Sequence, residues 1–95
     1  MRRRYCVSYD ISDDKRRDVV YKMLFGYGDH AQYSVFFCEL NGEELAELRG
    51  KLRKEIHHAE DQVMLIDLGL AANPLEVGLE VLGRGYKPPG RVTVV

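Results

Sequence analysis

The spacing of apolar residues alternates between strand and helix periodicity along most of this 95-residue chain. Residues 5–11 place apolar and polar side chains at alternate positions, which predicts a strand with two unlike faces. Ser12 is expected to cap a helix over residues 14–27, because apolar residues recur there at helical spacing and glycines follow. The expected buried stripe of this helix consists of Val19, Val20, Met23, Leu24 and Tyr27.

The same order of elements then repeats. Residues 30–40 are rich in aromatic and β-branched side chains, which predicts one strand or two, with a kink or break around residues 32–34. Asn41 and Glu44 match a capping box at the start of a second helix over residues 42–57. Its expected buried stripe consists of Leu45, Leu48, Leu52 and Ile56.

Two further strands complete the pattern. Residues 62–68 carry large apolar side chains at both odd and even positions, and RVTVV at residues 91–95 is expected to form a last strand. This order predicts an α+β, ferredoxin-like βαββαβ fold with an extra C-terminal strand. We expect a single domain over residues 1–95, with a core over about 4–70 and a C-terminal extension over about 71–95.

The two predicted helices can cover only one of the two faces of the predicted sheet. Val35 and Phe37 alternate with Phe36 and Cys38, so the middle strand is apolar on both sides, and two helices cover only one side. Packing against a second copy of the chain would cover the other side, so we expect a homodimer through the sheet faces. The polar face of the first strand, which ends at Asp10, would then lie at the seam.

Composition excludes several classes of protein. The net charge is −1, and no apolar run approaches the length of about 20 residues that a membrane span needs. The basic start of the chain is interrupted by polar residues before a signal-peptide core develops. We therefore expect a cytoplasmic protein without a membrane partner. Cys6 and Cys38 lie in apolar runs without metal-site or disulfide spacing, so both are expected to be reduced thiols.

Asp10 is the strongest candidate for a catalytic and metal-binding residue. In the expected dimer it would lie near its own copy across a twofold axis, where two carboxylates either take up a proton or bind a cation. Mg²⁺ suits such a site, because it uses one or two carboxylates and often bridges to phosphates. Arg16 or Arg17 would be available to hold a phosphate. A second interpretation also stays open, in which Asp10 only leads into the helix cap.

Cationic residues form local clusters despite the balanced net charge. They would contact nucleic-acid phosphates if the fold gathered them on one face, and otherwise they form solvated helix faces. His30 and Tyr33 likewise have two interpretations, as site residues or as exposed residues of a strand or loop. The clusters are Arg2 to Arg4, Lys15 to Arg17, Lys51 with Arg53 and Lys54, and Arg84 with Lys87 and Arg91.

Three motifs in this order resemble the CRISPR-associated protein 2 family. They are YDISDDKRRDVV at residues 9–20, QYSVFFCEL at residues 32–40 and EDQVMLIDLG at residues 60–69, and the resemblance as a whole extends over about residues 4–70. The resemblance implies a ferredoxin-like homodimer in which Asp10 is paired across the axis and binds Mg²⁺. It also implies a final strand that crosses to the partner subunit.

The resemblance assigns further residues by motif. Arg17 matches the arginine of the family's DDxxR motif, and Phe36 matches the aromatic of SVF, so both are expected to contact nucleic acid. Arg16 and His30 are the other two expected nucleic-acid contacts. Two positions depart from the family. Val19 stands where a second arginine is frequent, and His30 stands where a basic residue is often found. These departures weaken the case for vigorous nuclease activity or make it pH-dependent through His30.

Three classes of function follow. The first is a Mg²⁺-dependent endonuclease on single-stranded RNA or duplex DNA. The second is a non-catalytic dimeric bridge in spacer acquisition, which binds duplex DNA and the larger CRISPR-associated integrase. The third, independent of the resemblance, is a regulatory or toxin-type RNA-binding dimer. A role in spacer acquisition is the favoured interpretation, with nuclease activity as an additional property.

Overall fold

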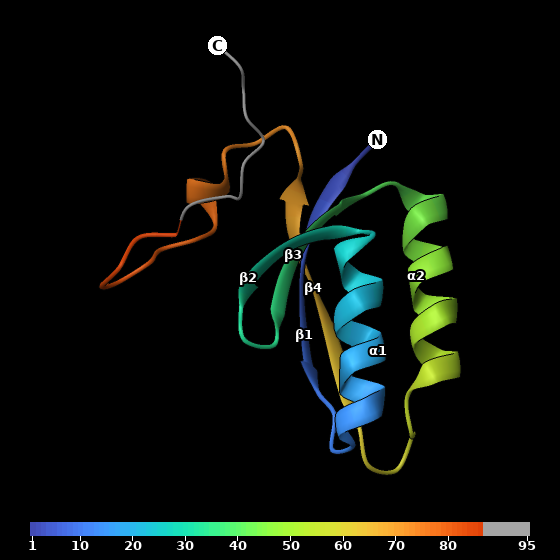
Figure 1. Ribbon diagram of the computed structural model, residues 1–95. Coiled ribbons are helices and arrows are strands. Elements are labelled where there is room, and N and C mark those ends of the chain that lie inside the picture. The colour runs from blue at the N-terminus through green and yellow to red at the C-terminus, as the bar shows by residue number, and fades with distance from the viewer. Residues whose placement is uncertain (87–95) are drawn as a thin grey trace.

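The computed structural model describes residues 1–86 and contains a four-stranded sheet and two α-helices (Figure 1). This is the predicted α+β arrangement of a ferredoxin-like fold. The strand expected at residues 91–95 lies outside the described residues. The described elements are, in chain order, β1 (Arg3–Asp10), α1 (Asp14–Phe25), β2 (Gly28–Gln32), β3 (Val35–Leu40), α2 (Gly42–Glu55), β4 (Gln62–Leu70) and a short 3-10 helix, η1 (Leu75–Val77).

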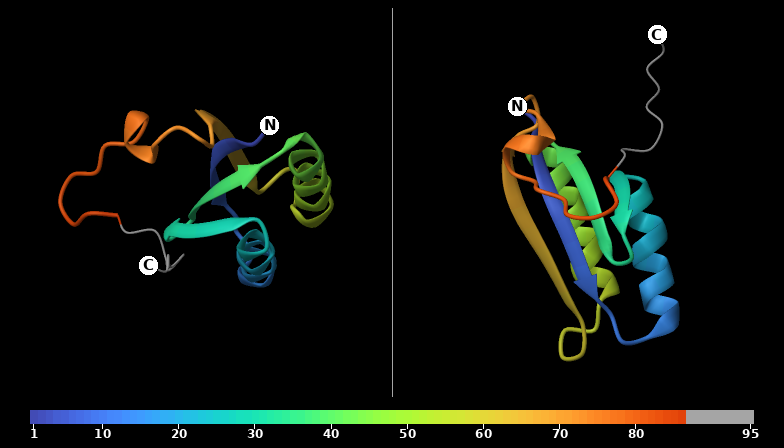
Figure 2. Two further views of the ribbon diagram at one scale, coloured as in Figure 1. Left: turned by 90° about the horizontal axis from the view of Figure 1, so that it is seen from above. Right: turned by 90° about the vertical axis from the view of Figure 1, so that its left-hand side faces the viewer.

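The sheet is antiparallel, with the strands in the order β2-β3-β1-β4. Figure 2 shows both helices on one side of the sheet and the segment after β4 on the other side. β1 is an inner strand, and its residue Ser8 lies opposite Val35 of β3 and Met64 of β4. The pairing of β1 with β3 ends at Ser8, so Asp10 at the end of β1 pairs with β4 alone, opposite Gln62.

The core lies between the sheet and the helices. Alternate residues of β1 are buried there, as the period of a strand requires, and so are alternate residues of β3. The predicted stripe of α2 is confirmed, since three of its leucines are buried and Ile56 packs against them. The buried residues are Tyr5, Val7, Tyr9, Ile11, Val20, Leu24, Phe36, Cys38, Leu40, Leu45, Leu48 and Leu52.

Two expectations about α1 were wrong. Asp13, not Ser12, caps the helix, because the Asp13 carboxylate accepts the backbone N–H of Arg16 while Ser12 donates its own N–H to Asp61. Val19 is 42% exposed, because the burial of this helix is centred on Val20 and Leu24. α1 and α2 each end two residues before the predicted boundary, whereas β4 extends two residues beyond it.

Residues 28–40 form two strands, as one of the two predicted alternatives required. A turn at Tyr33 and Ser34 separates β2 from β3. The hairpin packs closely at its other end, where a Cβ atom on Gly28 would lie 2.3 Å from the carbonyl oxygen of Phe37. Only glycine fits at this position without a shift of the β3 backbone.

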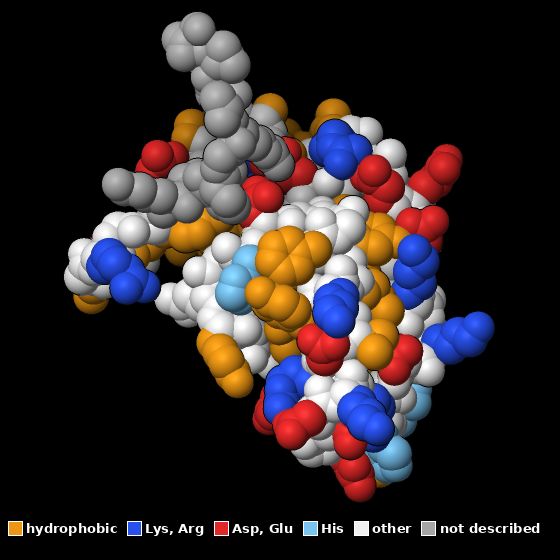
Figure 3. Space-filling model, in the orientation of Figure 1, with side chains coloured by type: hydrophobic (Ala, Val, Ile, Leu, Met, Phe, Trp, Pro, Cys, Tyr) orange, Lys and Arg blue, Asp and Glu red, His pale blue; other side chains and the backbone are white. Residues whose placement is uncertain are grey.

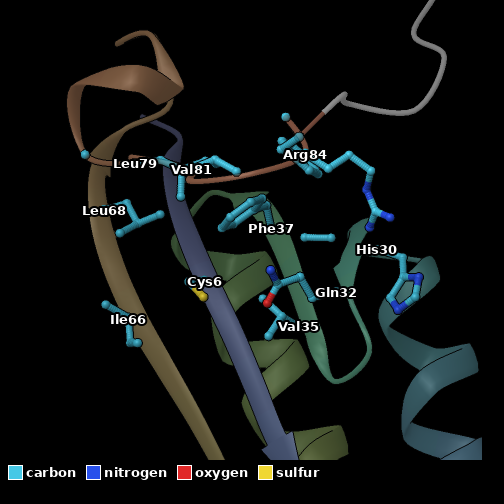
Figure 4. A pocket seen from close by; sticks show the side chains of 14 residues that line it. Cys6, His30, Gln32, Val35, Phe37, Ile66, Leu68, Leu79, Val81 and Arg84 are labelled. Carbon is cyan, nitrogen blue, oxygen red and sulfur yellow. The ribbon is translucent and has the colours of Figure 1, made fainter.

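The face of the sheet opposite the helices is apolar, and no helix of the described residues covers it. We call it the open face, and it carries Cys6, Val35, Phe37, Met64, Ile66 and Leu68. Residues 78–86 arch over this face and leave a cavity of about 800 Å³ beneath them (Figure 4). Met64 and Ile66 remain about half exposed on this face. Cys6 and Cys38 are both free thiols.

Within residues 1–86, neither α-helix is long and apolar enough to cross a membrane.

Candidate functional site

Asp10 ends β1 on the side of the open face. Its neighbour Tyr9 is buried toward the helices, so the alternation of the strand turns Asp10 the other way, and its side chain is exposed. Its partner across the β1–β4 pair is Gln62. Among residues 1–86 no hydrogen bond or ion pair engages the Asp10 carboxylate, so its oxygens are free to accept from an external group.

A single chain does not provide a complete metal site around Asp10. Within the described residues, no group of three histidine, cysteine, aspartate or glutamate side chains is close enough to hold an ion. Asp10 supplies one carboxylate and no more. A site for a hard cation at this position therefore needs ligands from a second molecule, such as another subunit, water or a phosphate.

Arg16 is held in an ion pair with Asp61. Its Nε donates to Asp61 Oδ2 at 2.9 Å, and its second guanidinium nitrogen donates to Asp61 Oδ1 at 3.2 Å, which is a bidentate ion pair. Together with backbone N–H groups of His57 and Ser12, this pairing lowers the pKa of Asp61 well below its usual range. The structure therefore places Arg16 in an internal ion pair beside the site.

Arg17 points into a different environment. Its guanidinium donates to the carbonyl oxygen of Ile11 at 2.8 Å and pairs with Asp14, and its side chain stays 31% exposed. It lines a shallow hollow of about 330 Å³ together with His30 and Tyr33, which is 83% exposed. Of the two arginines predicted to hold a phosphate, Arg17 is the one that lines an open hollow.

His30 packs among aromatic rings on the helix side of the sheet. Its ring centroid lies 5.2 Å from that of Tyr21, 5.0 Å from Phe36 and 6.0 Å from Phe25, and its Nε2 lies 3.4 Å from the carbonyl oxygen of Tyr33. Its ring is turned toward α1 in Figure 4. His30 therefore lies with Arg17, on the opposite face from Asp10.

Phe36 is at the centre of the same aromatic cluster. Its side chain is 0% exposed, which leaves no surface for contact with a nucleic acid in this structure. The structure thus separates the predicted site residues into three groups. Asp10 lies on the open face, and Arg17 and His30 line a hollow beside α1. Phe36 is buried, and Arg16 is half-buried in its ion pair with Asp61.

The predicted cationic clusters differ in how they are paired. Within residues 1–86, Lys15, Arg53 and Lys54 make no ion pair, whereas the arginines at the start of the chain do. Each of the three N-terminal arginines has an acidic partner, in the pairs Arg2–Glu44, Arg3–Asp67 and Arg4–Glu39. Over the helices, lysine and arginine side chains alternate with aspartate and glutamate (Figure 3). This face therefore carries no extended patch of one sign.

Asp61 is the residue of this region that the sequence analysis missed. It lies between an exposed loop and β4, and nothing in its local pattern distinguishes it from a surface acid. Its importance comes from long-range partners, because Arg16 is 45 positions away in the chain.

The sequence matches the family described as CRISPR associated protein Cas2 over residues 1–72. It is 42% identical over 94 residues to CRISPR-associated endoribonuclease Cas2 2 of Thermodesulfovibrio yellowstonii, covering 99% of this chain and 98% of the relative. It is 39% identical over 90 residues to CRISPR-associated endonuclease Cas2 2 of Thermus thermophilus, covering 92% of this chain and 89% of the relative.

Solved structures give the same answer for the fold. A crystal structure of a hypothetical protein from Thermus thermophilus superposes with a TM-score of 0.79 at 35% identity, covering 93% of this chain and 99% of the other. The crystal structure of Streptococcus pyogenes Cas2 at pH 6.5 gives a TM-score of 0.71 at 26% identity, covering 84% and 99%.

Proposed function

Because this chain belongs to the CRISPR-associated Cas2 family, we propose that two copies form a homodimer that binds nucleic acid in spacer acquisition, beside the larger integrase. We propose further that the dimer hydrolyses phosphodiester bonds with Mg²⁺ held by the two Asp10 carboxylates. The observation that carries this proposal is the exposed Asp10 carboxylate, unpaired within residues 1–86, at the end of an apolar sheet face.

The open face supports association of two copies. Its side chains are those of an interior, yet the chain leaves a cavity of about 800 Å³ above them, bounded by Leu79 and Val81 (Figure 4). An apolar wall of this kind loses dispersion contacts when nothing fills the space. Val77 and Leu82 add exposed apolar surface in the same segment. A second copy of the chain would cover both the open face and the exposed apolar side chains of this segment. Residues 71–95 would then contact the partner subunit.

The donor set fits a hard cation once two copies are present. Two Asp10 carboxylates would hold Mg²⁺, which commonly binds proteins through one or two carboxylates and keeps several waters. When bound, the ion supplies Lewis-acid activation of water and offsets charge on the phosphate. Arg17 would hold a phosphate of the substrate by exchanging its contact with Asp14 for a phosphate oxygen.

The names of the relatives favour RNA as the first substrate to test. The Thermodesulfovibrio relative is named an endoribonuclease, and one Thermus relative is named an endonuclease. We therefore propose single-stranded RNA as the substrate, with duplex DNA second. A dimer that binds duplex DNA without cutting it is the alternative, and the acids interspersed among the cations of the helix face argue against strong backbone binding there.

The test is cleavage of end-labelled single-stranded RNA and duplex DNA by the wild type and by Asp10→Ala, with Mg²⁺ or with EDTA. We expect cutting that requires both Mg²⁺ and Asp10, with a loss of at least about 100-fold in the variant, because removal of a metal carboxylate eliminates the proposed site. The oligomeric state of each protein is measured by sedimentation in the same buffers.

Glu43→Ala is the matched control. Glu43 is an exposed carboxylate at the start of α2, at the opposite end of the sheet from Asp10, so its removal should leave cleavage unchanged. Equal cutting by the wild type and Asp10→Ala would eliminate the catalytic proposal. Binding of duplex DNA without cutting by either protein would leave the bridging function.

A further inference from the structure

Asp61 is a fully buried carboxylate at the junction of two loops. Its side chain is 0% exposed, and it receives hydrogen bonds from three parts of the chain. The backbone N–H of His57 donates at 2.8 Å, that of Ser12 at 3.1 Å, and Arg16 adds its bidentate contact. Through these hydrogen bonds, Asp61 connects the loop before β4 to the loop after β1 and to the first turn of α1.

Two of the residues next to Asp10 are linked to Asp61. Ser12, which donates to Asp61, lies two residues after Asp10. Gln62, which follows Asp61, is the residue opposite Asp10 in the β1–β4 pair. The Asp61 carboxylate therefore holds the end of β1 in two ways. It binds the residue that follows Asp10 by two positions, and Asp61 itself precedes the β4 residue that pairs with Asp10.

We infer that Asp61, held by Arg16, is a positioning residue that fixes the Asp10 carboxylate for cation binding. The inference rests on the proposed function, because it concerns the same Asp10 site. Asp61 does not touch the cation or the substrate. It acts by holding the end of β1, so that the two Asp10 side chains of a dimer meet at one ion.

The physical reason is the demand that a shared ion makes on geometry. Mg²⁺ requires near-ideal octahedral geometry with short metal–oxygen distances, so a strand end that moves costs affinity. Outer residues that orient metal ligands commonly change metal affinity or activity by about 10- to 100-fold when they are mutated. The Arg16–Asp61 pair is suited to this role, because a bidentate contact fixes direction as well as distance.

The test uses Asp61→Asn in the full-length protein. Asparagine has the same shape, and it removes the charge and one of the two acceptors that Arg16 uses. We expect Mg²⁺ affinity, measured by titration calorimetry with Mg²⁺ alone, to fall by about 10- to 100-fold. Addition of excess Mg²⁺ should restore most of the cleavage rate, because Asp10 itself is intact.

Asp67→Asn is the matched control. Asp67 also lies on β4, accepts from Arg3 Nε at 2.9 and 3.1 Å and from the N–H of Gly69, but lies at the opposite end of the strand from Asp10. It should change Mg²⁺ affinity by less than about twofold. Arg16→Lys is the second variant, since it keeps the positive charge and loses the bidentate contact, and it serves the test if Asp61→Asn does not fold.

The outcomes separate this inference from the proposed function. If Asp10→Ala loses Mg²⁺ binding while folded Asp61→Asn and Arg16→Lys bind it as the wild type does, the positioning role is wrong and the metal site stands. If Asp10→Ala binds Mg²⁺ as the wild type does, the metal site is wrong and the positioning role fails with it. A rise in the Mg²⁺ requirement of Asp61→Asn or Arg16→Lys, without a change in dimerisation, supports the inference.

Discussion

At the scale of single residues, Arg16 and Arg17 have different partners although they are adjacent in the chain. Successive residues of a helix point about 100° apart, so the two guanidinium groups leave α1 in different directions. Arg16 reaches Asp61 beside β4, whereas Arg17 returns to Ile11 and Asp14 and lines the hollow near His30. Arg17 therefore lines an open hollow, whereas Arg16 faces the loop before β4 and is 24% exposed.

The contribution of Asp61 to the free energy of unfolding should depend on pH. The Arg16 side chain and the N–H groups of His57 and Ser12 hold the pKa of Asp61 below its usual range in the folded protein. A depressed pKa contributes stability at neutral pH, and this contribution is lost as the pH falls from the unfolded value of about 3.9 through the folded value.

The prediction is measured by urea unfolding of the wild type and Asp61→Asn at several pH values. The difference between their free energies of unfolding should be largest near pH 7 and should shrink below about pH 4. A difference that stays constant down to pH 3 would contradict the role of the Asp61 charge.

At the scale of elements, α2 shows how much a helix start depends on neighbouring residues. The Asn41 side chain accepts the N–H of Glu44 at 2.8 Å, and the Glu44 carboxylate accepts the N–H of Asn41 at 2.8 Å. Both contacts span three residues, so they were predictable from the sequence. At α1 the cap is displaced by one residue, because Ser12 is engaged by distant Asp61.

Asn41→Ala should lower the free energy of unfolding by about 0.5–2 kcal/mol, because it removes the acceptor for one unpaired N–H of the first turn. The measurement is urea unfolding at pH 7. Glu43→Ala, next to the same turn but outside the capping box, should lower it by less than about 1 kcal/mol. Equal losses in the two variants would show that the capping box does not stabilise α2.

In the molecule as a whole, the helices cover one face of the sheet and leave the other face open for association. Both helices lie on the same side, and the open face keeps Ile66 at 46% exposure. A charge placed at Ile66 remains solvated in a single chain but would be buried between two copies.

Ile66→Arg is therefore expected to convert a dimer into a folded monomer. Sedimentation equilibrium should give twice the chain mass for the wild type and the chain mass for the variant, with the helical circular dichroism unchanged. Val19→Arg is the control, since Val19 is similarly exposed at 42% but lies on α1. A wild type that is monomeric at micromolar concentration, or a dimeric Ile66→Arg, would contradict association through the open face.

The candidate site was predictable in part. Asp10 on the open face followed from the alternation of β1, a local property that needs no distant partner. The burial of Phe36 and the ion pair of Arg16 did not follow. Both depend on residues far away in the chain, namely the rings of Tyr21 and Phe25 for Phe36 and the carboxylate of Asp61 for Arg16.

The order of elements, the two faces of β1 and the capping box of α2 could be predicted from the amino acids alone, because each depends on periodicity or on contacts within a few residues. The partners of each cation, the joining of two loops by Asp61 and the arch of residues 78–86 over the open face became visible in the folded chain alone. These features require segments distant in the chain to meet, and burial and charge pairing are set where they meet.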